Sequence, residues 1–252
     1  MPPQPNCALV PTIQGNPDIA IIALPDGSDA TLRVRRSARA KRVAIRILPN
    51  SFAAELVLPP KVSRRQGIKF ASERAAWLQD HLARLPTPVP FADGAVFPFL
   101  DRPITIRRLD ASIDSVRRDD DDLIVRIARR DLSAAVRGYL RDEARRELSV
   151  RAMDMSDRIG RPFRRLTVRD THSRWGSCSW QGDLSFSWRL IFSPEWVLDY
   201  LVAHEVSHLV HMDHSASFWR LVEELGGKPD EARRWLRNNG PGLYRYGAVT
   251  AA

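Results

Sequence analysis

Two histidines and a glutamate lie within one short segment, in the pattern His204-Glu205-x-x-His208. Histidines four residues apart lie on one face of a helix, so their imidazoles can bind one zinc ion. The glutamate then lies beside the metal, where its carboxylate can take a proton from a metal-activated water. A chain of this composition contains the pattern by chance only about 0.005 times. The spacing therefore predicts a metal-dependent hydrolase with Glu205 as general base.

A catalytic zinc site needs a third protein ligand, with the fourth position left to water or substrate. His214 can supply it if the helix ends near Met212–Asp213 and the chain folds back, after which Ser215 or Ser217 can cap the next helix. Three other residues that follow His208 are alternatives for the third ligand: His211, Glu223 and Glu224. The spacing alone leaves this choice open.

The helix that carries these residues is predicted to be buried. Ser193 is a suitable N-cap, and Pro194 suits the first helical position. The apolar residues of this helix lie on all of its sides rather than on one face. They are Val197, Leu198, Leu201, Val202, Val206, Leu209 and Val210. Polar side chains in such a helix need partners.

The elements around this helix follow from hydrophobic periodicity and from turn residues. We expect an antiparallel meander of strands at 19–24, 31–36, 42–48 and 53–58, hairpins at 95–109 and 113–127, the second turning at Asp119–Asp122, and strands at 163–169 and 184–192. Helical spacing predicts helices over 63–84 and from about 131 to 155. The segment 175–182 is expected to be a glycine-bearing turn.

These elements indicate an α+β fold of two parts. The predicted organisation is a flexible N-terminus at 1–17, a β-rich antiparallel domain at 18–130 with the helix 63–84, a catalytic domain at 131–246 and a flexible C-terminus at 247–252. A boundary near Pro86–Asp93 is the alternative. The catalytic domain is expected to combine helices with a small antiparallel sheet.

Composition and charge limit the classes of function. The chain has 252 residues with 44% hydrophobic residues, a net charge of +9 and two cysteines, Cys7 and Cys178. The cysteines are too few and too far apart for a disulfide framework or a cysteine-built zinc site. No apolar run has the length of a membrane span or of a signal peptide. We therefore expect a cytoplasmic protein with no membrane partner.

Two further groups of residues are weaker candidates. Cys178 with His172 could be a nucleophile and its base, but a structural cysteine in a tight turn is the commoner situation. The basic residues of Arg33–Arg46 could bind the phosphates of a nucleotide or nucleic acid, although charges on the outer face of a strand are the commoner explanation.

Three segments together resemble a known family. They are His172-Ser-Arg-Trp-Gly-Ser-Cys-Ser, Phe186-Ser-Trp-Arg-Leu-Ile, and the run from Asp199 to Trp219 that contains the histidines. This sequence resembles the YgjP-like family of zinc metallopeptidases, which is related to the SprT-like proteases. The resemblance extends from about Thr31 to Tyr246. Ser187 departs from it, because an asparagine is usual at that position.

The resemblance implies a zincin-like catalytic domain with one Zn²⁺ held by His204, His208 and His214, and Glu205 as the catalytic residue. Its expected partner is a peptide or an unfolded protein. Four other residues are candidates for the substrate cleft, the tyrosines as donors to an oxyanion: Arg174, Trp175, Tyr244 and Tyr246.

Two alternative functions start from the same metal site or from the positive net charge of the chain. One is a hydrolase of nucleotide phosphoanhydrides, although three imidazoles suit zinc better than the magnesium that accompanies triphosphates. The other is a SprT-like protease or binding module associated with nucleic acid, which has only the positive charge in its favour.

Overall fold

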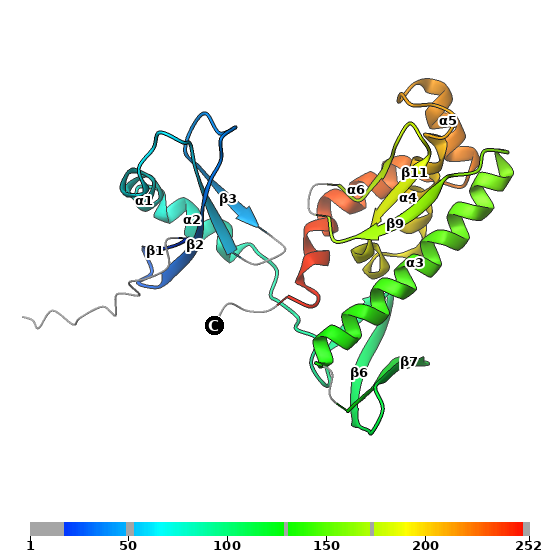
Figure 1. The fold of residues 1–252 in the computed structure, drawn as a ribbon, viewed down its shortest axis with the longest axis horizontal. Coiled ribbons are helices and arrows are strands. Elements are labelled where there is room, and N and C mark those ends of the chain that lie inside the picture. The colour runs from blue at the N-terminus through cyan, green and yellow to red at the C-terminus, as the bar shows by residue number, and fades with distance from the viewer. Residues whose placement is uncertain (1–17, 49–52, 129–130, 172–173, 249–252) are drawn as a thin grey trace, which may run out of the picture. The chain divides into compact units, whose positions relative to one another are not determined.

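A computed structural model of the chain describes residues 18–48, 53–128, 131–171 and 174–248 (Figure 1). The chain forms two compact units, and the sequence passes from the first to the second after Arg84. We call the described residues 18–48 and 53–84 the N-terminal unit and those from 85 to 248 the C-terminal unit. The boundary expected near residue 130 lies inside the C-terminal unit, whereas the alternative near Pro86–Asp93 lies close to the junction.

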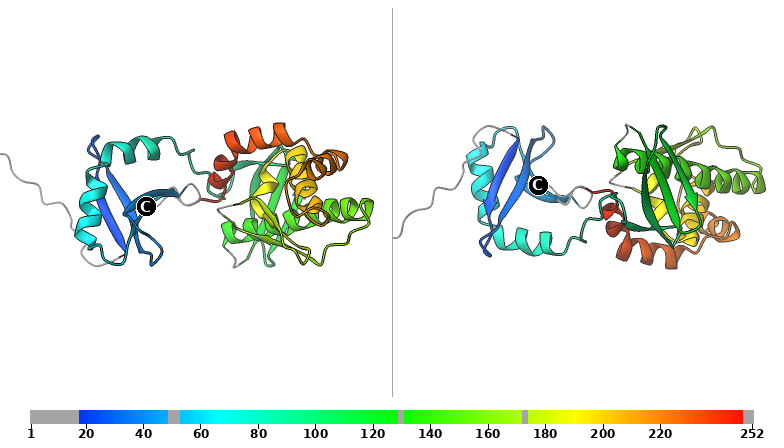
Figure 2. Two further views of the ribbon diagram at one scale, coloured as in Figure 1. Left: turned by 90° about the horizontal axis from the view of Figure 1, so that it is seen from above. Right: turned by 90° about the horizontal axis from the view of Figure 1, so that it is seen from below.

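The N-terminal unit is one four-stranded sheet with two helices on one of its faces (Figure 2). The strands have the order β1-β2-β4-β3, with bounds β1 Ile19–Ala23, β2 Asp29–Arg36, β3 Ala44–Leu48 and β4 Ala53–Leu58. Buried residues alternate with exposed ones along β1 and β2, and those on the buried face pack under α1 (Arg64–Ser72) and α2 (Ala75–Ala83).

Two predictions for this unit are wrong in detail. The sheet is mixed rather than antiparallel, because β3 pairs with the outer edge of β4 and leaves β2 and β4 side by side in parallel. The helix predicted over 63–84 is two helices. The chain leaves the helical conformation at Arg74, where φ is −117° and ψ is 21°.

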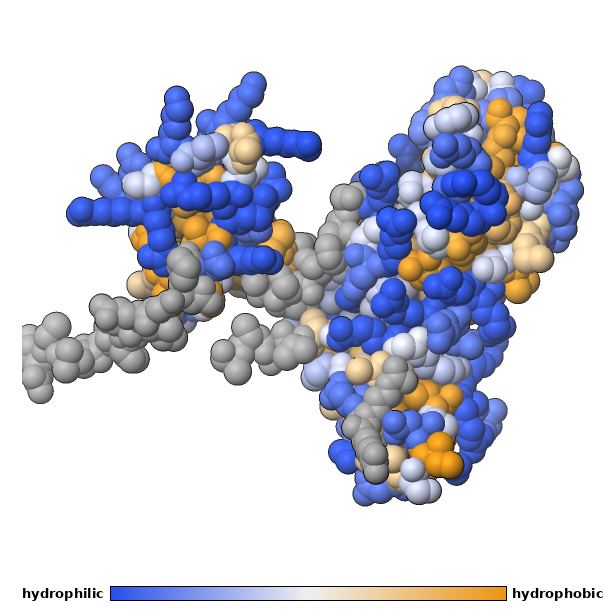
Figure 3. Space-filling model, in the orientation of Figure 1, coloured by the Kyte–Doolittle hydropathy of each residue, from blue (hydrophilic) through white to orange (hydrophobic). Residues whose placement is uncertain are grey.

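The basic segment Arg33–Arg46 lies in this unit. Arg33 and Arg35 alternate with the buried Leu32 and Val34 along β2, and Arg35 donates to the Glu55 carboxylate at 3.0 Å. Hydrophilic side chains project from the N-terminal unit in the space-filling view (Figure 3). This placement matches the expectation of charges on the outer face of a strand.

The C-terminal unit contains a second four-stranded sheet of the same topology, β5-β6-β8-β7. Its strands are β5 Val96–Phe99, β6 Arg102–Asp110, β7 Ser115–Asp119 and β8 Asp122–Ile127, and β6 and β8 run parallel, which corrects the antiparallel expectation. The long helix α3 (Leu132–Arg158) packs on this sheet and also on the elements that follow it (Figure 1). One core therefore spans the predicted boundary at residue 130.

A third sheet, with the order β10-β11-β9, lies beside the other end of α3. β9 (Arg165–Arg169) pairs in parallel with β11 (Asp183–Ser187), and β10 (Gly176–Cys178) is antiparallel to β11. This sheet is also mixed, and β10 occupies part of the predicted turn 175–182. Residues 188–192, expected to be strand, form a 3₁₀ helix, η1.

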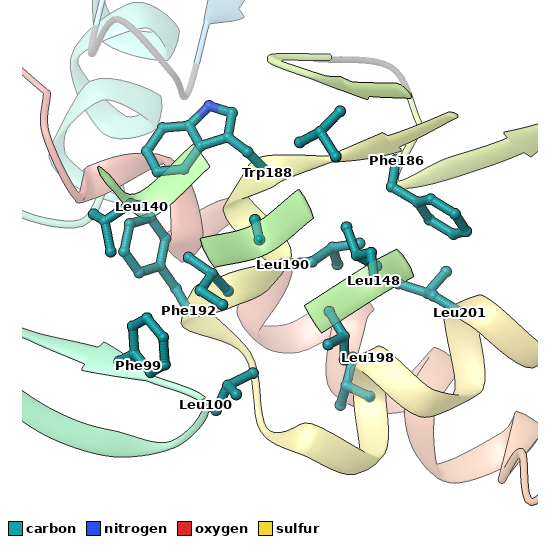
Figure 4. Packing of buried hydrophobic residues seen from close by; sticks show 14 of the residues in the cluster. Phe99, Leu100, Leu140, Leu148, Phe186, Trp188, Leu190, Phe192, Leu198 and Leu201 are labelled. Atoms are coloured by element: carbon teal, nitrogen blue, oxygen red, sulfur yellow. The ribbon is translucent and has the colours of Figure 1, made fainter. Parts of the chain in front are cut away.

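The core of the C-terminal unit forms around α3, η1 and α4 (Glu195–Ser207). Leu140 and Leu148 of α3 pack with Trp188, Leu190 and Phe192 of η1 (Figure 4). Two further helices and a 3₁₀ helix complete the unit: α5 Ala216–Glu224, α6 Pro229–Asn239 and η2 Gly240–Arg245. α4 is thus fixed along its length by packing.

The predicted flexible N-terminus, 1–17, and residues 249–252 of the predicted C-terminal one lie outside the described residues. The backbone N–H of Gly247 donates to Val89, and Ala248 is buried. None of the helices in the described ranges combines the length and apolar character needed to cross a bilayer.

Candidate active site

α4 carries His204 and Glu205 in its last turn and ends at Ser207. The predicted N-cap is wrong by one residue, because Pro194 occupies the cap position and the Ser193 hydroxyl donates to the Leu190 carbonyl of η1. Apolar residues of α4 are buried on all sides, so its last turn is held firmly.

The chain folds back directly after α4, about five residues earlier than predicted. The N–H groups of Val210 and His211 both donate to the Ser207 carbonyl. The His208 side chain stabilises this turn, because its Nδ1 lies 2.9 Å from the His211 carbonyl oxygen. A proton on Nδ1 donates to that carbonyl and leaves the Nε2 lone pair free to bind a metal.

The turn brings three histidines together. His204, His208 and His214 offer ring nitrogens that all lie within 4.8 Å of one another, and the Nε2 atoms of His204 and His214 are 3.3 Å apart. Two nitrogens bound to one zinc ion at tetrahedral angles lie about 3.3–3.4 Å apart. The spacing of this pair fits a shared metal ion. Among the described residues, the buried Nδ1 of His204 has no hydrogen-bond partner.

Aromatic side chains of α5 hold the three imidazoles in place. The Phe218 ring lies 4.6 Å from that of His208 and 4.8 Å from that of His214, measured between centroids. Trp219 lies 5.7 Å from His204. α5 begins at Ser215, whose hydroxyl accepts from the Phe218 N–H, as the sequence predicted for a capping serine.

Burial keeps two of the imidazoles neutral. Burial lowers the pKa of His204 most, the neighbouring His208, His214 and Arg233 also lower it, and together they bring it to about 4. Burial also lowers the pKa of His208, although its bond to the His211 carbonyl acts in the opposite direction. A neutral imidazole is the form that binds a metal.

Glu205 is 5% exposed and lies against β10. Burial raises the pKa of Glu205, while Arg174 and the backbone N–H of Cys178 act in the opposite direction by stabilising the carboxylate, and the resulting pKa is about 7. A Cβ atom on Gly176 would lie 2.5 Å from the Glu205 Oε1 atom. The carboxylate therefore occupies space that any side chain at position 176 would fill.

A cavity of about 370 Å³ opens beside His204 and Glu205. Trp175 lines it, and Arg174 lines a second cavity on the neighbouring sheet. Neither tyrosine lines the first cavity. The Tyr244 hydroxyl donates to the Thr171 carbonyl, and the Tyr246 ring packs on Phe192.

The remaining candidates take structural positions or lie apart. His172 lies outside the described residues. Burial, together with the nearby Glu205 and Asp183, raises the pKa of Cys178 to about 11, so the thiol is protonated at neutral pH and is a poor nucleophile. Ser187, the departure from the family pattern, is completely buried, and its hydroxyl has no partner among the described residues.

The structure also separates the candidates for a third ligand. The group of ring nitrogens that includes His204 and His208 contains His214 but neither His211, Glu223 nor Glu224. Sequence reasoning missed Gly176, Tyr200 and Arg233. A glycine within a strand signals a close approach, and the four-residue spacing from Tyr200 to His204 puts both on one face of the predicted helix, so these two could have been noticed. Nothing in the sequence placed Arg233 on this cavity.

Comparison with known proteins identifies a family for this chain. The model of the YgjP-like family, described as a metallopeptidase domain, matches residues 41–239, which include the three histidines and Glu205. No curated protein matches the sequence.

Among solved structures, the metallopeptidase zymogen of Pyrococcus abyssi abylysin is similar, with 21% identity over 40% of this chain and 99% of that chain. Its TM-score of 0.33 is too low to support an argument about this fold. The family match covers more than three quarters of the sequence. The chain belongs to the YgjP-like metallopeptidase family.

Proposed function

We propose that the chain is a zinc-dependent peptidase in which His204, His208 and His214 hold one zinc ion and Glu205 is the general base. The observation that carries this proposal is the convergence of three imidazoles beside a buried carboxylate. Imidazole nitrogens at tetrahedral spacing suit zinc. The fold proposed for this half of the chain is zincin-like.

Zinc bound there would polarise the scissile carbonyl and make a water molecule a better nucleophile. Glu205 takes the proton from the attacking water and later gives it to the leaving amine. The Cys178 N–H donates to this carboxylate, and the missing side chain at Gly176 leaves the space in which it lies. α4, fixed by its buried neighbours, positions the base relative to the two histidines on either side of it in sequence.

The test of this proposal compares two classes of substrate. The zinc-loaded protein is incubated with a library of unfolded peptides and, separately, with nucleoside triphosphates. We expect new peptide termini that disappear when a chelator is added and return with zinc, and we expect the triphosphates to stay intact. Phosphate release without peptide cleavage would show that the protein is a phosphohydrolase and would reject the proposal.

A smaller change tests how Glu205 is positioned. In Gly176→Ala the new methyl group would displace the carboxylate, so kcat for a peptide substrate should fall at least about tenfold while zinc is retained. Gly242→Ala is the matched control, because a Cβ atom at Gly242 meets no other atom within 4 Å. Equal activity of the two variants would contradict the proposed position of the base.

A further inference from the structure

The proposed reaction benefits from a hydrogen-bond donor at the scissile carbonyl, because attack by water places negative charge on the carbonyl oxygen. Tyr244 and Tyr246, the tyrosines expected in this role, do not line the cavity beside Glu205. Among the residues that do line it are a tyrosine of α4 and two arginines of α6: Tyr200, Arg233 and Arg237. Their donor groups therefore belong to the same cavity as the proposed base.

α6 is fixed against α4 on both sides of Arg233 in sequence. The two helices pack on one another (Figure 1). Ala232 is completely buried, and the Trp235 ring lies 6.5 Å from the Trp196 ring of α4, measured between centroids. The backbone that carries Arg233 is thus held relative to the helix that carries the base.

The guanidinium of Arg233 lies near the converging imidazoles. It lies 5.4 Å from the centre of the Trp219 ring, and that ring lies 5.7 Å from His204 and 5.6 Å from His214, measured between centroids. Arg233 is also one of the groups that lower the pKa of His204. A cation over an indole ring is attracted to it. The aromatic ring that contacts the imidazoles therefore also positions this cation.

The charge of Arg233 is available to a ligand. Arg233 forms no ion pair with a carboxylate of the described ranges. A guanidinium does not lose its proton in a protein, and its N–H groups are donors only. A negatively charged oxygen in the cavity would therefore find a permanent cation there.

Arg233 suits the carbonyl oxygen better than the other two donors. Arg237 lies one turn farther along α6 and is not among the groups that act on His204. Tyr200 keeps its proton, because burial raises its pKa, but it offers a single uncharged donor. Hydrogen bonds from a charged donor to a negative oxygen are about twice as strong as neutral ones.

We propose that Arg233 is a further catalytic residue, which donates to the carbonyl oxygen of the scissile peptide bond. As the water oxygen bonds to the carbonyl carbon, a proton of the water passes to Glu205, and the π electron pair of the carbonyl moves onto its oxygen. Arg233 stabilises that negative charge and keeps its own protons. The oxygen then re-forms the carbonyl, the C–N bond pair leaves with the nitrogen, and that nitrogen takes the proton from Glu205.

This inference deepens the proposed peptidase function and rests on it. The substrate for its test is the peptide of the library that the wild-type protein cleaves fastest. In Arg233→Gln, kcat should fall about 100-fold while KM changes by no more than a few-fold, because the bond is made mainly in the transition state. Arg233→Lys keeps the charge without the planar fork, so it should recover part of the loss.

Arg234→Gln is the matched control. Arg234 is the next residue of α6, is exposed and lies outside the cavity. This variant loses the same charge from the same helix, so it should have the kcat and KM of wild type. An equal loss in both variants would reduce the effect to net charge and would overturn the inference.

An analogue of the tetrahedral intermediate provides a readout that needs no turnover. The probe is the same peptide with a phosphinate group in place of the scissile amide, which puts negative charge on tetrahedral oxygens. Its affinity for the zinc-loaded protein should fall in Arg233→Gln by about the same factor as kcat/KM. Affinity for the uncleaved peptide, measured in the Glu205→Gln background, should stay within a few-fold.

Zinc affinity separates a catalytic role from support of the metal site, since Arg233 lies over the Trp219 ring. Competition against a chromophoric chelator should give the same zinc affinity for Arg233→Gln and wild type. Loss of zinc binding in proportion to activity, or activity within a few-fold of wild type, would contradict the role of Arg233. So would a large loss in Tyr200→Phe with none in Arg233→Gln, which would assign the donor to Tyr200.

The wild-type protein distinguishes this inference from the function beneath it. If wild type cleaves peptides and Arg233→Gln does so equally well, only the role of Arg233 is rejected. If wild type cleaves no peptide, the proposed function itself is removed.

Discussion

Glu205→Gln is expected to lower turnover of a peptide substrate by about 1,000-fold while leaving zinc binding and the fold unchanged. Glutamine has nearly the same shape, so it can fill the space above Gly176 and accept the Cys178 N–H through its carbonyl oxygen. It cannot take a proton from water, which is the step assigned to the base.

The thermal stability of Glu205→Gln should not fall with its activity. Glu205 is 5% exposed, and burial of its charged form is unfavourable, as the raised pKa indicates. A neutral amide avoids this cost, so the melting temperature of the metal-free variant should be no lower than that of wild type. If Glu205→Gln lost activity because it unfolds, its melting temperature would instead be lower than that of wild type.

Glu195→Gln is the matched control, because Glu195 lies on the same helix but is exposed at its first turn. Kinetics on one verified peptide, with metal analysis and thermal unfolding of both variants, provide the comparison. Turnover of Glu205→Gln within a few-fold of wild type would reject Glu205 as the base.

Local sequence signals predicted most of the elements but not how the strands pair. Alternation of apolar residues located β1, β2 and β4 to within about two residues. All three sheets are nevertheless mixed, because each contains one parallel pair between strands that are not consecutive. Pairing of that kind depends on contacts between distant residues, which periodicity along one strand does not report.

In the candidate site, too, local spacing was predictable from the sequence and contacts between distant residues were not. The spacing of His204 and His208 on a helix followed from the sequence, since it depends only on helical geometry. The strand β10 is only three residues long, too short for a periodic pattern, and it was expected to be a turn. Arg233 lies on a helix rich in charge, which alone indicates a solvated face, and only the packing of α6 places it beside His204.

His214→Ala is expected to weaken zinc binding by more than the roughly 100-fold that loss of an outer-shell partner costs, because it removes one of three proposed direct ligands. The Nε2 atoms of His214 and His204 lie 3.3 Å apart, a distance that suits a shared ion. His214 is exposed and lies between α4 and α5. Its truncation leaves no buried cavity, so the metal-free variant should unfold at the wild-type temperature.

Competition against a chromophoric chelator measures zinc affinity in this variant and in two controls, His211→Ala and Glu223→Ala. Both controls should bind zinc as wild type does. The His211 side chain is outside the group of converging nitrogens, and its backbone carbonyl, which accepts from His208, is kept in the alanine variant. Unchanged affinity in His214→Ala together with a loss in Glu223→Ala would move the third ligand to α5, because a carboxylate from that helix would then complete the site.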